Sequence, residues 1–432
     1  MVPLRISTAE RPHSPVRFGL FKRKKCGHRL SGSTAPGLML LACVVALFSC
    51  SNPHKTLTSS GSQVISEAVT VFESGAQGYK SFRIPAIIKA PDGSLLAFAE
   101  GRVDGGADFG HVKIVVRSSK DQGDSWSPIR VAASNGKLQA GNPAPIVDYT
   151  DPAYPKGRIF LFYNTGNVDE GEMRKKLGVR EVWYVTSTDN GNSWSAPVNI
   201  TDQTSKIDQP RLKTSWNHPE DWRSYANTPG HGLQIQTGPH KGRLYVAANH
   251  SEGDPKADFT DYVAHGFYSD DHGKSFHISD NNAFRGSNES TAAEISNGRL
   301  MMNSRDQSGR QPYRIVAISS DAGQSWDTTY YDKQLPDPVC EGAIVTLQYQ
   351  KKQKGHNILA FSNAASKTSR DSLTLRISYD DGLSWKDHYL IDPKNTAYSD
   401  LVALDKNQVG ILYEAEGYHK INFKKVNWKH GQ

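Results

Sequence analysis

Apolar residues in this chain occur in short runs of β-branched and aromatic side chains, separated by polar stretches. Examples are Ile114-Val115-Val116, Ile159 to Tyr163 and Leu244-Tyr245-Val246. Such runs are typical of strands, whereas a helix would repeat apolar residues every three or four positions over a longer stretch. From residue 64 onward we find no long helical period, so the pattern predicts a domain made mostly of β-strands.

One eight-residue pattern, Ser-x-Asp-x-Gly-x-Ser followed by an aromatic residue, returns five times. Its aspartates lie 68, 82, 50 and 59 residues apart, which is longer than one hairpin and suits one four-stranded unit per copy. A ring of such units is a β-propeller, and the spacing predicts this architecture. The copies are Ser119 to Trp126, Ser187 to Trp194, Ser269 to Phe276, Ser319 to Trp326 and Ser378 to Trp385.

The residue types of the repeat suit a hairpin turn. An Asp side chain can accept hydrogen bonds from the turn backbone, Gly can adopt a positive φ, and the aromatic ring can pack beneath. The alternative, that the aspartates are metal ligands or catalytic acids, is disfavoured because each repeat already uses its Asp internally. We therefore interpret as structural Asp121, Asp189, Asp271, Asp321 and Asp380.

The N-terminal residues have the pattern of an export signal. A basic cluster, Lys22 to Lys25, precedes an apolar run of 11 residues, Leu38 to Phe48, which is too short to cross a bilayer as a helix. The run ends in Leu47-Phe48-Ser49-Cys50, which resembles a bacterial lipobox. We predict that Cys50 is lipidated; a plain secretory signal that happens to contain a cysteine is the alternative.

The chain therefore divides into a lipoprotein signal peptide over residues 1–49, a flexible Ser/Thr-rich tether over 50–63 and a folded domain over 64–432. The protein would be exported to the bacterial cell envelope as an outer-membrane lipoprotein facing the periplasm or the cell surface. It would contact a membrane through the lipid anchor only.

The net charge of +7 gives no argument for a nucleic-acid partner. The chain has 51 Lys and Arg and 44 Asp and Glu, and eight of the basic residues with one acidic residue lie in the signal peptide, so the remainder is neutral. Of four cysteines only Cys340 lies within 64–432, which excludes a disulfide inside the domain. Cysteines and histidines show no ligand spacing, so we predict no metal and no cofactor, and we interpret His231 as a loop-shaping residue.

Further motifs resemble those of the Asp-box sialidase (neuraminidase) superfamily, in particular bacterial exo-α-sialidases. The most specific is Phe82-Arg83-Ile84-Pro85, which is similar to the family's Arg-Ile-Pro motif, and the resemblance extends from about Val64 to Trp428. It implies an all-β, six-bladed β-propeller with the active site at one end of its axis. The other matching motifs are Phe98 to Arg102, Gly141 to Pro145, Gly230 to Gly232, Asn303 to Arg305 and Tyr398 to Leu401.

Three arginines, Arg83, Arg305 and Arg370, match the family's substrate-binding triad. Sialic acid carries a carboxylate on its anomeric carbon, and arginine forks pair bidentately with carboxylates. Arg376 is the alternative to Arg370, and we disfavour it because it lies inside a predicted strand.

The setting of Arg83 can be predicted from its neighbours. Because Pro85 restricts Ile84 to an extended backbone, we expect Arg83 to project to the face opposite Phe82 and Ile84. Glu414 matches the family carboxylate that orients Arg83.

Tyr398 matches the family's tyrosine nucleophile, and Glu289 matches the carboxylate that acts as its base. A neutral phenol avoids the repulsion that an anionic nucleophile would meet from the substrate carboxylate, but its pKa of about 10 means that it needs a base. Glu294 is the alternative base. We prefer Glu289 because it lies 16 residues before Arg305, and because Glu294 has the pattern of a solvent-facing strand residue.

The general acid is expected in the loop after Arg102, where Asp108-Phe109-Gly110 matches the family pattern. Asp104 is the alternative, and Asp108 is preferred for its distance to the following strand. Arg102 would flank the sugar near this acid.

The resemblance implies an exo-α-sialidase that hydrolyses terminal α-linked sialic acids of glycoproteins, glycolipids and oligosaccharides with retention, through a tyrosyl-enzyme intermediate. Its partners would be sialylated glycans. A trans-sialidase is the nearest alternative because transfer uses the same residues, and a glycan-binding propeller without catalysis is the alternative from another class. The pattern leaves linkage preference and oligomeric state open.

Overall fold

The structure is a computed structural model that describes residues 64–350 and 355–429. The predicted signal peptide and the whole of the predicted tether, including Cys50, lie outside the described residues. Within these ranges nearly every element is an antiparallel strand, and the helical elements are short: α1 (Glu170–Arg174), α2 (Thr201–Thr204) and two 3-10 turns. In the described part of the chain no helix is long and apolar enough to cross a membrane.

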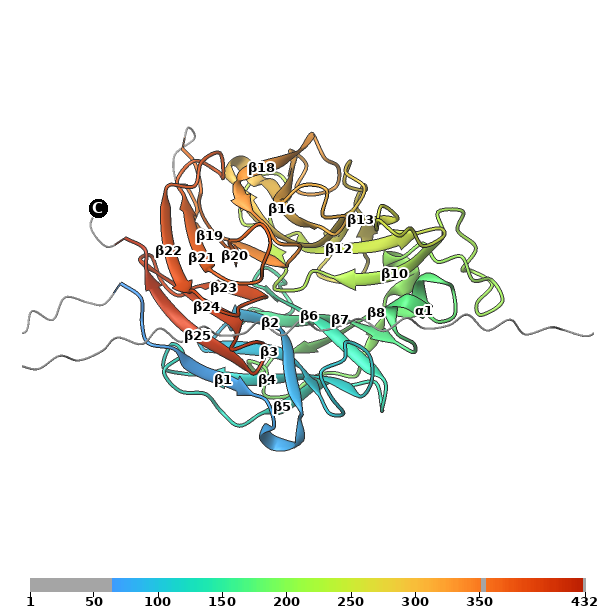
Figure 1. Ribbon diagram of the computed structural model, residues 1–432, viewed down its shortest axis with the longest axis horizontal. Coiled ribbons are helices and arrows are strands. Elements are labelled where there is room, and N and C mark those ends of the chain that lie inside the picture. Colours follow the sequence, from blue (N-terminus) through green and yellow to red (C-terminus); the bar gives the residue numbers. More distant parts are fainter. Residues whose placement is uncertain (1–63, 351–354, 430–432) are drawn as a thin grey trace, which may run out of the picture. The chain divides into compact units, whose positions relative to one another are not determined.

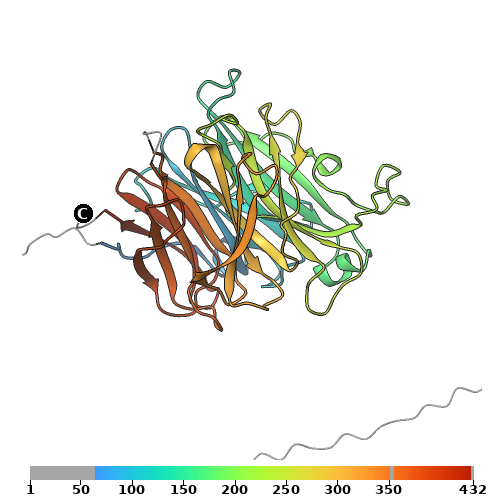
Figure 2. The same cartoon turned by 90° about the horizontal axis from the view of Figure 1, so that it is seen from above.

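The strands form sheets of consecutive strands arranged around a common centre, so the predicted all-β propeller is confirmed (Figures 1 and 2). The first strands lie innermost and contact one another. β2 (Ser81–Lys89) contacts β6 (Gln139–Asp148) and β23 (Ser399–Ala403), and β19 (Gly342–Gln348) contacts β15 (Ser287–Ile295) and β23. The largest described sheet consists of β2 (Ser81–Lys89), β3 (Leu95–Arg102), β4 (Val112–Ser119), β5 (Arg130–Ala133), β6 (Gln139–Asp148), β7 (Arg158–Gly166), β8 (Arg180–Ser187) and β9 (Val198–Asn199).

The next sheets follow in chain order around the ring. They consist of β10 (Trp222–Asn227), β11 (Leu233–Gln234), β12 (Leu244–Glu252), β13 (Tyr262–Ser269) and β14 (His277–Ile278); then β15 (Ser287–Ile295), β16 (Arg299–Asp306), β17 (Tyr313–Ser319) and β18 (Thr328–Pro336); then β19 (Gly342–Gln348), β20 (Ile358–Ala364), β21 (Leu373–Ser378) and β22 (Asp387–Asp392).

The last sheet joins the two ends of the described chain. It consists of β23 (Ser399–Ala403), β24 (Gln408–Ala415), β25 (Lys420–Asn427) and, as its outer strand, β1 (Val69–Glu73). β1 pairs antiparallel with β25, with Thr70 opposite Asn422. Phe72 of β1 also packs on Phe82 of β2, with 5.2 Å between ring centroids. The ring is therefore closed by hydrogen bonds between β1 and β25 and by packing of β1 on β2.

Each of the five repeats forms a turn, as predicted, and the structure places it between the third and fourth strands of a unit. In the first, Asp121 Oδ1 accepts a hydrogen bond from the Ser125 N–H at 2.9 Å, and Ser125 Oγ donates to Oδ2. Hydrogen bonds from the Ser125 side chain and backbone lower the pKa of Asp121 to about 2. Gly123 has a φ of +94°, and a Cβ there would lie 2.1 Å from the Phe423 ring. Trp126 packs on Phe423 with centroids 5.7 Å apart, so the turn also ties neighbouring sheets together.

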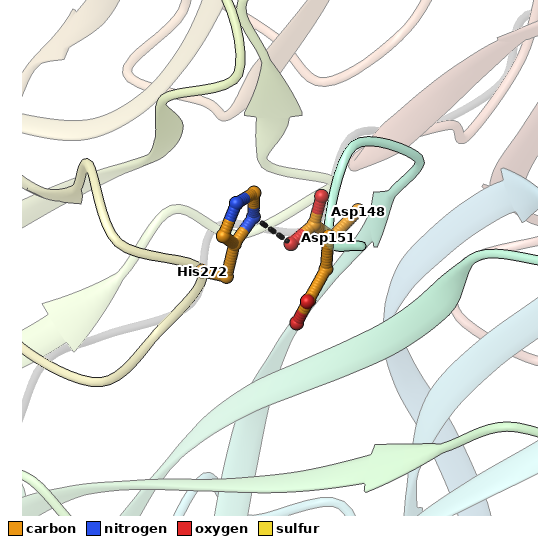
Figure 3. A group of neighbouring side chains, drawn as sticks. All are labelled: Asp148, Asp151 and His272. Atoms are coloured by element: carbon orange, nitrogen blue, oxygen red, sulfur yellow. Dashed lines mark hydrogen bonds and ion pairs between the residues drawn. The ribbon is translucent and has the colours of Figure 1, made fainter. Parts of the chain in front are cut away.

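The third repeat is further tied to the sheet that precedes it. His272 Nδ1 lies 2.9 Å from Asp148 Oδ2, and Asp151 lies beside them (Figure 3). The Arg158 guanidinium donates to Asp151 Oδ2 at 2.9 Å and to the His272 carbonyl at 2.7 Å. This network fastens the turn to the loop between β6 and β7.

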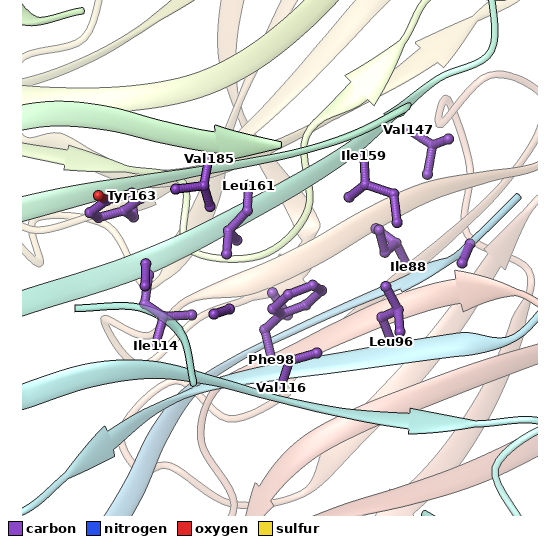
Figure 4. Packing of buried hydrophobic residues seen from close by; sticks show 14 of the residues in the cluster. Ile88, Leu96, Phe98, Ile114, Val116, Val147, Ile159, Leu161, Tyr163 and Val185 are labelled. Carbon is purple, nitrogen blue, oxygen red and sulfur yellow. The ribbon is translucent and has the colours of Figure 1, made fainter. Parts of the chain in front are cut away.

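The apolar core fills the space between neighbouring sheets. In the cluster of Figure 4, Phe98 of β3 and Val116 of β4 face Leu161 of β7 and Val185 of β8. Trp194 of the second repeat meets Phe98 edge to face, with centroids 6.0 Å apart. Packing on both faces explains why strands inside the sheets, such as β3 and β7, are buried along nearly their whole length.

Candidate active site

One pocket of about 650 Å³ gathers most of the predicted site. β2 begins beside it, while β4, which runs in the same direction as β2, ends at a repeat turn. The pocket and the repeat turns therefore lie at opposite ends of the strands. Of the predicted side chains it is lined by Arg83, Arg102, Asp108, Glu289, Arg305, Arg370 and Tyr398.

Arg83 is aimed into the pocket by an irregularity in β2. The pairing of β2 with β3 shifts between Arg83 and Ala86, and Ile84 has a φ of +58°. The expected extended backbone at Ile84 is therefore wrong. Glu414 stabilises the observed conformation, because its Oε1 accepts hydrogen bonds from both the Ile84 N–H at 2.9 Å and Arg83 Nε at 2.6 Å. A positive φ at a β-branched residue costs about 1–3 kcal/mol, which places local strain at this site.

Glu414 lies behind the pocket wall on β24 and is fully buried. Burial opposes the charged form of Arg83, but the Glu414 carboxylate outweighs this and raises the pKa of Arg83. The arginine is thus a permanent cation with a fixed direction.

The predicted nucleophile and base are in direct contact. The Tyr398 hydroxyl donates to Glu289, 2.6 Å from Oε1 and 2.8 Å from Oε2. Arg305 Nη1 donates to Glu289 Oε2 at 2.6 Å and to the Tyr398 oxygen at 3.0 Å. Burial and then the charge of Glu289 raise the pKa of Tyr398 well above its usual value. The phenol is therefore neutral at physiological pH, and its proton already points at a carboxylate.

Arg370 completes the predicted triad from the loop before β21. Its guanidinium donates to the Val339 carbonyl at 3.0 Å and to the Tyr418 hydroxyl at 3.3 Å. Among the described residues no carboxylate forms an ion pair with Arg370. It therefore offers its charge to a ligand, unlike Arg83 and Arg305, which share theirs with glutamates.

Tyr418 is a site residue that the sequence did not reveal. It lies in the hairpin between β24 and β25, and its ring centroid is 4.1 Å from the Arg83 guanidinium carbon. The ring covers one arginine while the hydroxyl contacts another, Arg370. The one available signal was its position four residues after Glu414, on the turn that follows that strand.

Asp108 lies in the loop between β3 and β4, and its side chain is 86% exposed. Arg102 Nη2 binds its Oδ1 at 2.8 Å and is itself held by Glu100 Oε2 at 2.7 Å. Asp104 is exposed and does not line the pocket. Of the two candidate acids, Asp108 is thus the one whose carboxylate reaches the pocket wall.

The second candidate base and the second candidate for the third arginine both lie away from the pocket. Glu294 is buried and accepts the N–H groups of Gln236 and Thr237 at 2.6 and 2.9 Å, so the solvent-facing interpretation is wrong. It closes a turn at the far end of β15, and burial raises its pKa. Arg376 is buried against Asn363, and burial lowers its pKa to about 10.

His231 does not line the pocket, but it contacts Asp400 of β23, which follows the pocket residue Tyr398 by two positions. Its Nδ1 is 2.6 Å from Asp400 Oδ1, and its N–H donates to Oδ2 at 3.1 Å. Asp400 Oδ2 also accepts the Ile87 N–H at 2.8 Å. Burial opposes the charged ring, but Asp400 outweighs it and raises the pKa of His231. His231 thus connects its loop to β23 through Asp400, which also binds β2.

Two groups with reactive or ligating atoms lie outside the pocket. Cys340 is a buried free thiol, and burial raises its pKa. In the described part of the chain Asp148, Asp151 and His272 could hold a cation, since their ligand atoms lie within 4.8 Å of one another. The Arg158 guanidinium already supplies a positive charge there, and Gln234 donates to Asp148 Oδ1 at 2.7 Å. Their hydrogen bonds are thus those of a structural network.

Comparison with known proteins gives a consistent picture. The family model described as "BNR repeat-like domain" matches residues 93–411. A sialidase of Micromonospora viridifaciens is 34% identical over 81% of this chain, and one of Bacteroides fragilis is 29% identical over 84%. The chain spans 52% of the first protein and 64% of the second.

Solved structures agree with these relatives. The structure named "Hadza microbial sialidase Hz136" superposes with a TM-score of 0.70 at 26% identity, over 84% of this chain and 68% of that one. A leech intramolecular trans-sialidase shares the fold, with a TM-score of 0.64 at 17% identity, over 84% of this chain and 70% of that one.

Proposed function

This chain belongs to the BNR-repeat sialidase family, and from that premise we propose that it hydrolyses terminal α-linked sialic acids from glycans. The observation that carries the proposal is the Tyr398–Glu289 contact at 2.6 Å with Arg305 beside both groups. A buried phenol pointed at a carboxylate suits nucleophilic catalysis on a centre that bears a negative charge.

The pocket's cations support an anionic substrate. Arg83, Arg305 and Arg370 line one cavity, and a sugar carboxylate could pair with their forks. The net positive wall around a neutral nucleophile favours a sialoside over an uncharged glycoside, because a neutral sugar would leave Arg370 without a counter-ion.

In the proposed reaction the Tyr398 oxygen bonds to the anomeric carbon as its proton passes to Glu289. The bond from that carbon to the leaving oxygen breaks, and Asp108 gives this oxygen a proton. A water molecule that Asp108 deprotonates then attacks the same carbon, the tyrosyl bond breaks, and Glu289 returns the proton to the phenol. Two inversions give net retention.

An assay with an aryl α-sialoside and with sialyllactose tests the proposal. We expect hydrolysis of both, loss of both in Tyr398→Phe, and a smaller loss on the aryl substrate than on sialyllactose in Asp108→Ala, because a good leaving group needs little protonation. Proton NMR should detect the α-anomer of the sugar first. No turnover of either substrate would overturn the proposal, and sialyl transfer to added lactose would identify a trans-sialidase.

We also propose that the propeller has six blades. The largest sheet consists of two antiparallel groups, β2 to β5 and β6 to β9, joined by a single parallel residue pair, Val112 with Gln139. One such pair is a contact between neighbouring blades rather than a ladder. An experimental structure would test this count.

For the N-terminal region we propose export and lipidation at Cys50. The support is the sequence pattern of residues 1–50. Mass spectrometry of the membrane-extracted protein should find a lipidated Cys50 as the first residue; an unmodified Cys50 or a retained signal peptide would overturn the proposal.

A further inference from the structure

Gln139 lies where two groups of strands meet and reaches the loop that carries Asp108. It is the first residue of β6, its backbone pairs with Val112 of β4, and its side chain is buried. Its Nε2 donates to the Asp108 carbonyl at 2.7 Å. In the described residues no other hydrogen bond reaches that carbonyl. Gln139 is thus the contact that fixes the backbone of Asp108 itself.

The direction of the Gln139 amide is set by a neighbour that can only donate. Arg180 Nη2 lies 3.2 Å from Gln139 Oε1. Because a guanidinium has no acceptor, it selects the amide oxygen and turns the NH2 group toward Asp108. Arg180 is buried and donates through Nη1 to the Tyr225 carbonyl at 3.5 Å, so it is anchored in the pocket wall.

Two glycines leave space for this arrangement. A Cβ at Gly166 would lie 2.8 Å from Gln139 Oε1, whereas a Cβ at Gly141 would first meet Glu100 Oε1 at 2.4 Å and would lie 3.3 Å from Gln139 Nε2. A side chain at Gly166 would therefore displace the amide oxygen, and one at Gly141 would press first on Glu100 and then on the amide nitrogen. The space around Gln139 therefore matches the side chain that occupies it.

We propose that Gln139, oriented by Arg180, is a positioning residue that holds Asp108 where it protonates the leaving oxygen. This proposal rests on the proposed function. Arg102 also holds Asp108, but through its carboxylate, and that ion pair weakens when the carboxyl is protonated to act as an acid. The Gln139 contact goes to the carbonyl and does not depend on that proton. It therefore persists in the protonation state that the reaction needs.

Gln139→Met tests the proposal, because it keeps the side chain's length and removes the donor. General acids contribute about 10²- to 10⁴-fold, so we expect kcat/KM on sialyllactose to fall about 10- to 100-fold and kcat/KM on an aryl sialoside to fall less than about 3-fold. Gln234→Met is the matched control, since Gln139 and Gln234 are each 6% exposed and Gln234 lies outside the pocket. This control should not lower kcat/KM on sialyllactose more than kcat/KM on the aryl sialoside.

Combination with the acid separates positioning from general damage. In an Asp108→Ala background, Gln139→Met should cause no further loss on sialyllactose, because the group it positions is gone. Arg180→Met should reproduce the substrate selectivity, and the double variant with Gln139→Met should be no worse than either single variant.

Equal losses on both substrates, no loss at all, or full additivity with Asp108→Ala would overturn the role of Gln139 while leaving the sialidase proposal standing. If the wild-type protein turned over neither substrate, the proposed function itself would fail, and the two failures would be distinguished.

Discussion

At the residue scale, the three arginines of the pocket differ in the partner groups that would remain if each arginine were removed. Removing Arg83 leaves the fully buried Glu414 carboxylate without its cation, whereas Arg370 donates to a carbonyl and a hydroxyl and lies over the Tyr398 ring. An uncompensated buried charge is expensive, while loss of Arg370 leaves no such charge. Two members of the same triad should therefore respond differently to the same substitution.

We predict that Arg370→Ala lowers kcat/KM on sialosides, with a loss of about 2–5 kcal/mol in transition-state binding free energy. It should leave the free energy of unfolding nearly unchanged. Arg83→Ala should lower both activity and stability, the latter by about 3–5 kcal/mol. Denaturant unfolding monitored by fluorescence measures the difference. Adding Glu414→Gln to Arg83→Ala should restore part of the stability; no restoration would contradict this account.

The His231–Asp400 pair predicts a pH dependence of stability. The folded-state pKa of His231 is raised above its unfolded value of about 6.5, so the pair stabilises the fold below that pH, and this contribution is lost as pH rises through the folded pKa. His250, whose pKa burial lowers to about 4, acts with the opposite sign. Wild type must therefore be compared with a variant at each pH.

His231→Gln should narrow the pH range over which the protein is most stable. The difference in unfolding free energy between wild type and variant should be larger at about pH 5.5 than at about pH 9. Thermal unfolding by circular dichroism at both pH values provides the measurement. If the difference in unfolding free energy between wild type and variant grew with pH, the charged His231–Asp400 pair would not be the source of the stabilisation.

Which site residues the sequence could reveal depends on the range of the contacts that position them. Motifs near in sequence identified Arg83, Tyr398 and Asp108, because each lies in a short pattern of its own. Gln139 and Tyr418 were not found, since their partners lie on other strands. Ile84 shows the same limit: Pro85 predicted an extended backbone, but φ is +58° and the Ile84 N–H donates to Glu414, 330 positions away.

At the element scale, the repeat turns were predictable because one short segment contains nearly all of its own hydrogen bonds. In the fourth, Asp321 Oδ1 accepts from the Gln324 and Ser325 N–H groups at 3.0 and 2.9 Å, and Oδ2 accepts from Ser325 Oγ at 2.6 Å. The burial of Glu294 was not predictable in this way, because the turn it closes belongs to another sheet.

Asp321→Ala should destabilise the protein by about 1–3 kcal/mol, because it leaves turn donors without an acceptor. Asp327→Ala, in the same turn region, removes an exposed carboxylate that accepts one hydrogen bond from Ser320 and should cost less than about 0.5 kcal/mol. Urea unfolding of both variants compares them. Equal costs would mean that the Asp is not what holds the turn.

At the scale of the whole molecule, β1 closes the ring as an outer strand, and the sheet it joins has no repeat turn. Its third and fourth strands, β25 and β1, come from opposite ends of the described chain, so no hairpin links them. The spacing of the repeats predicted units of four strands. It could not reveal how the ring closes, since that pairing involves no repeated motif.

Phe72→Ala should weaken this closure by about 3–5 kcal/mol, because Phe72 is 1% exposed and packs on Phe82 of the next sheet. Leu390→Ala is the control: Leu390 also lies on an outer strand but is 54% exposed, so it should change the midpoint of thermal unfolding little. A small effect of Phe72→Ala would mean that the ring holds without its first strand.

The pairing of β1 with β25 also sets an order on biosynthesis. Thr70 and Asn422 lie opposite each other but 352 positions apart, and at about 5–20 residues per second the second is made roughly 20 to 70 s after the first. β1, the first strand of the described residues, thus waits longest for its neighbour, with its backbone edge open to other chains. At five residues β1 is short, which limits that hazard, and the final closure must wait until nearly the whole chain has been synthesised.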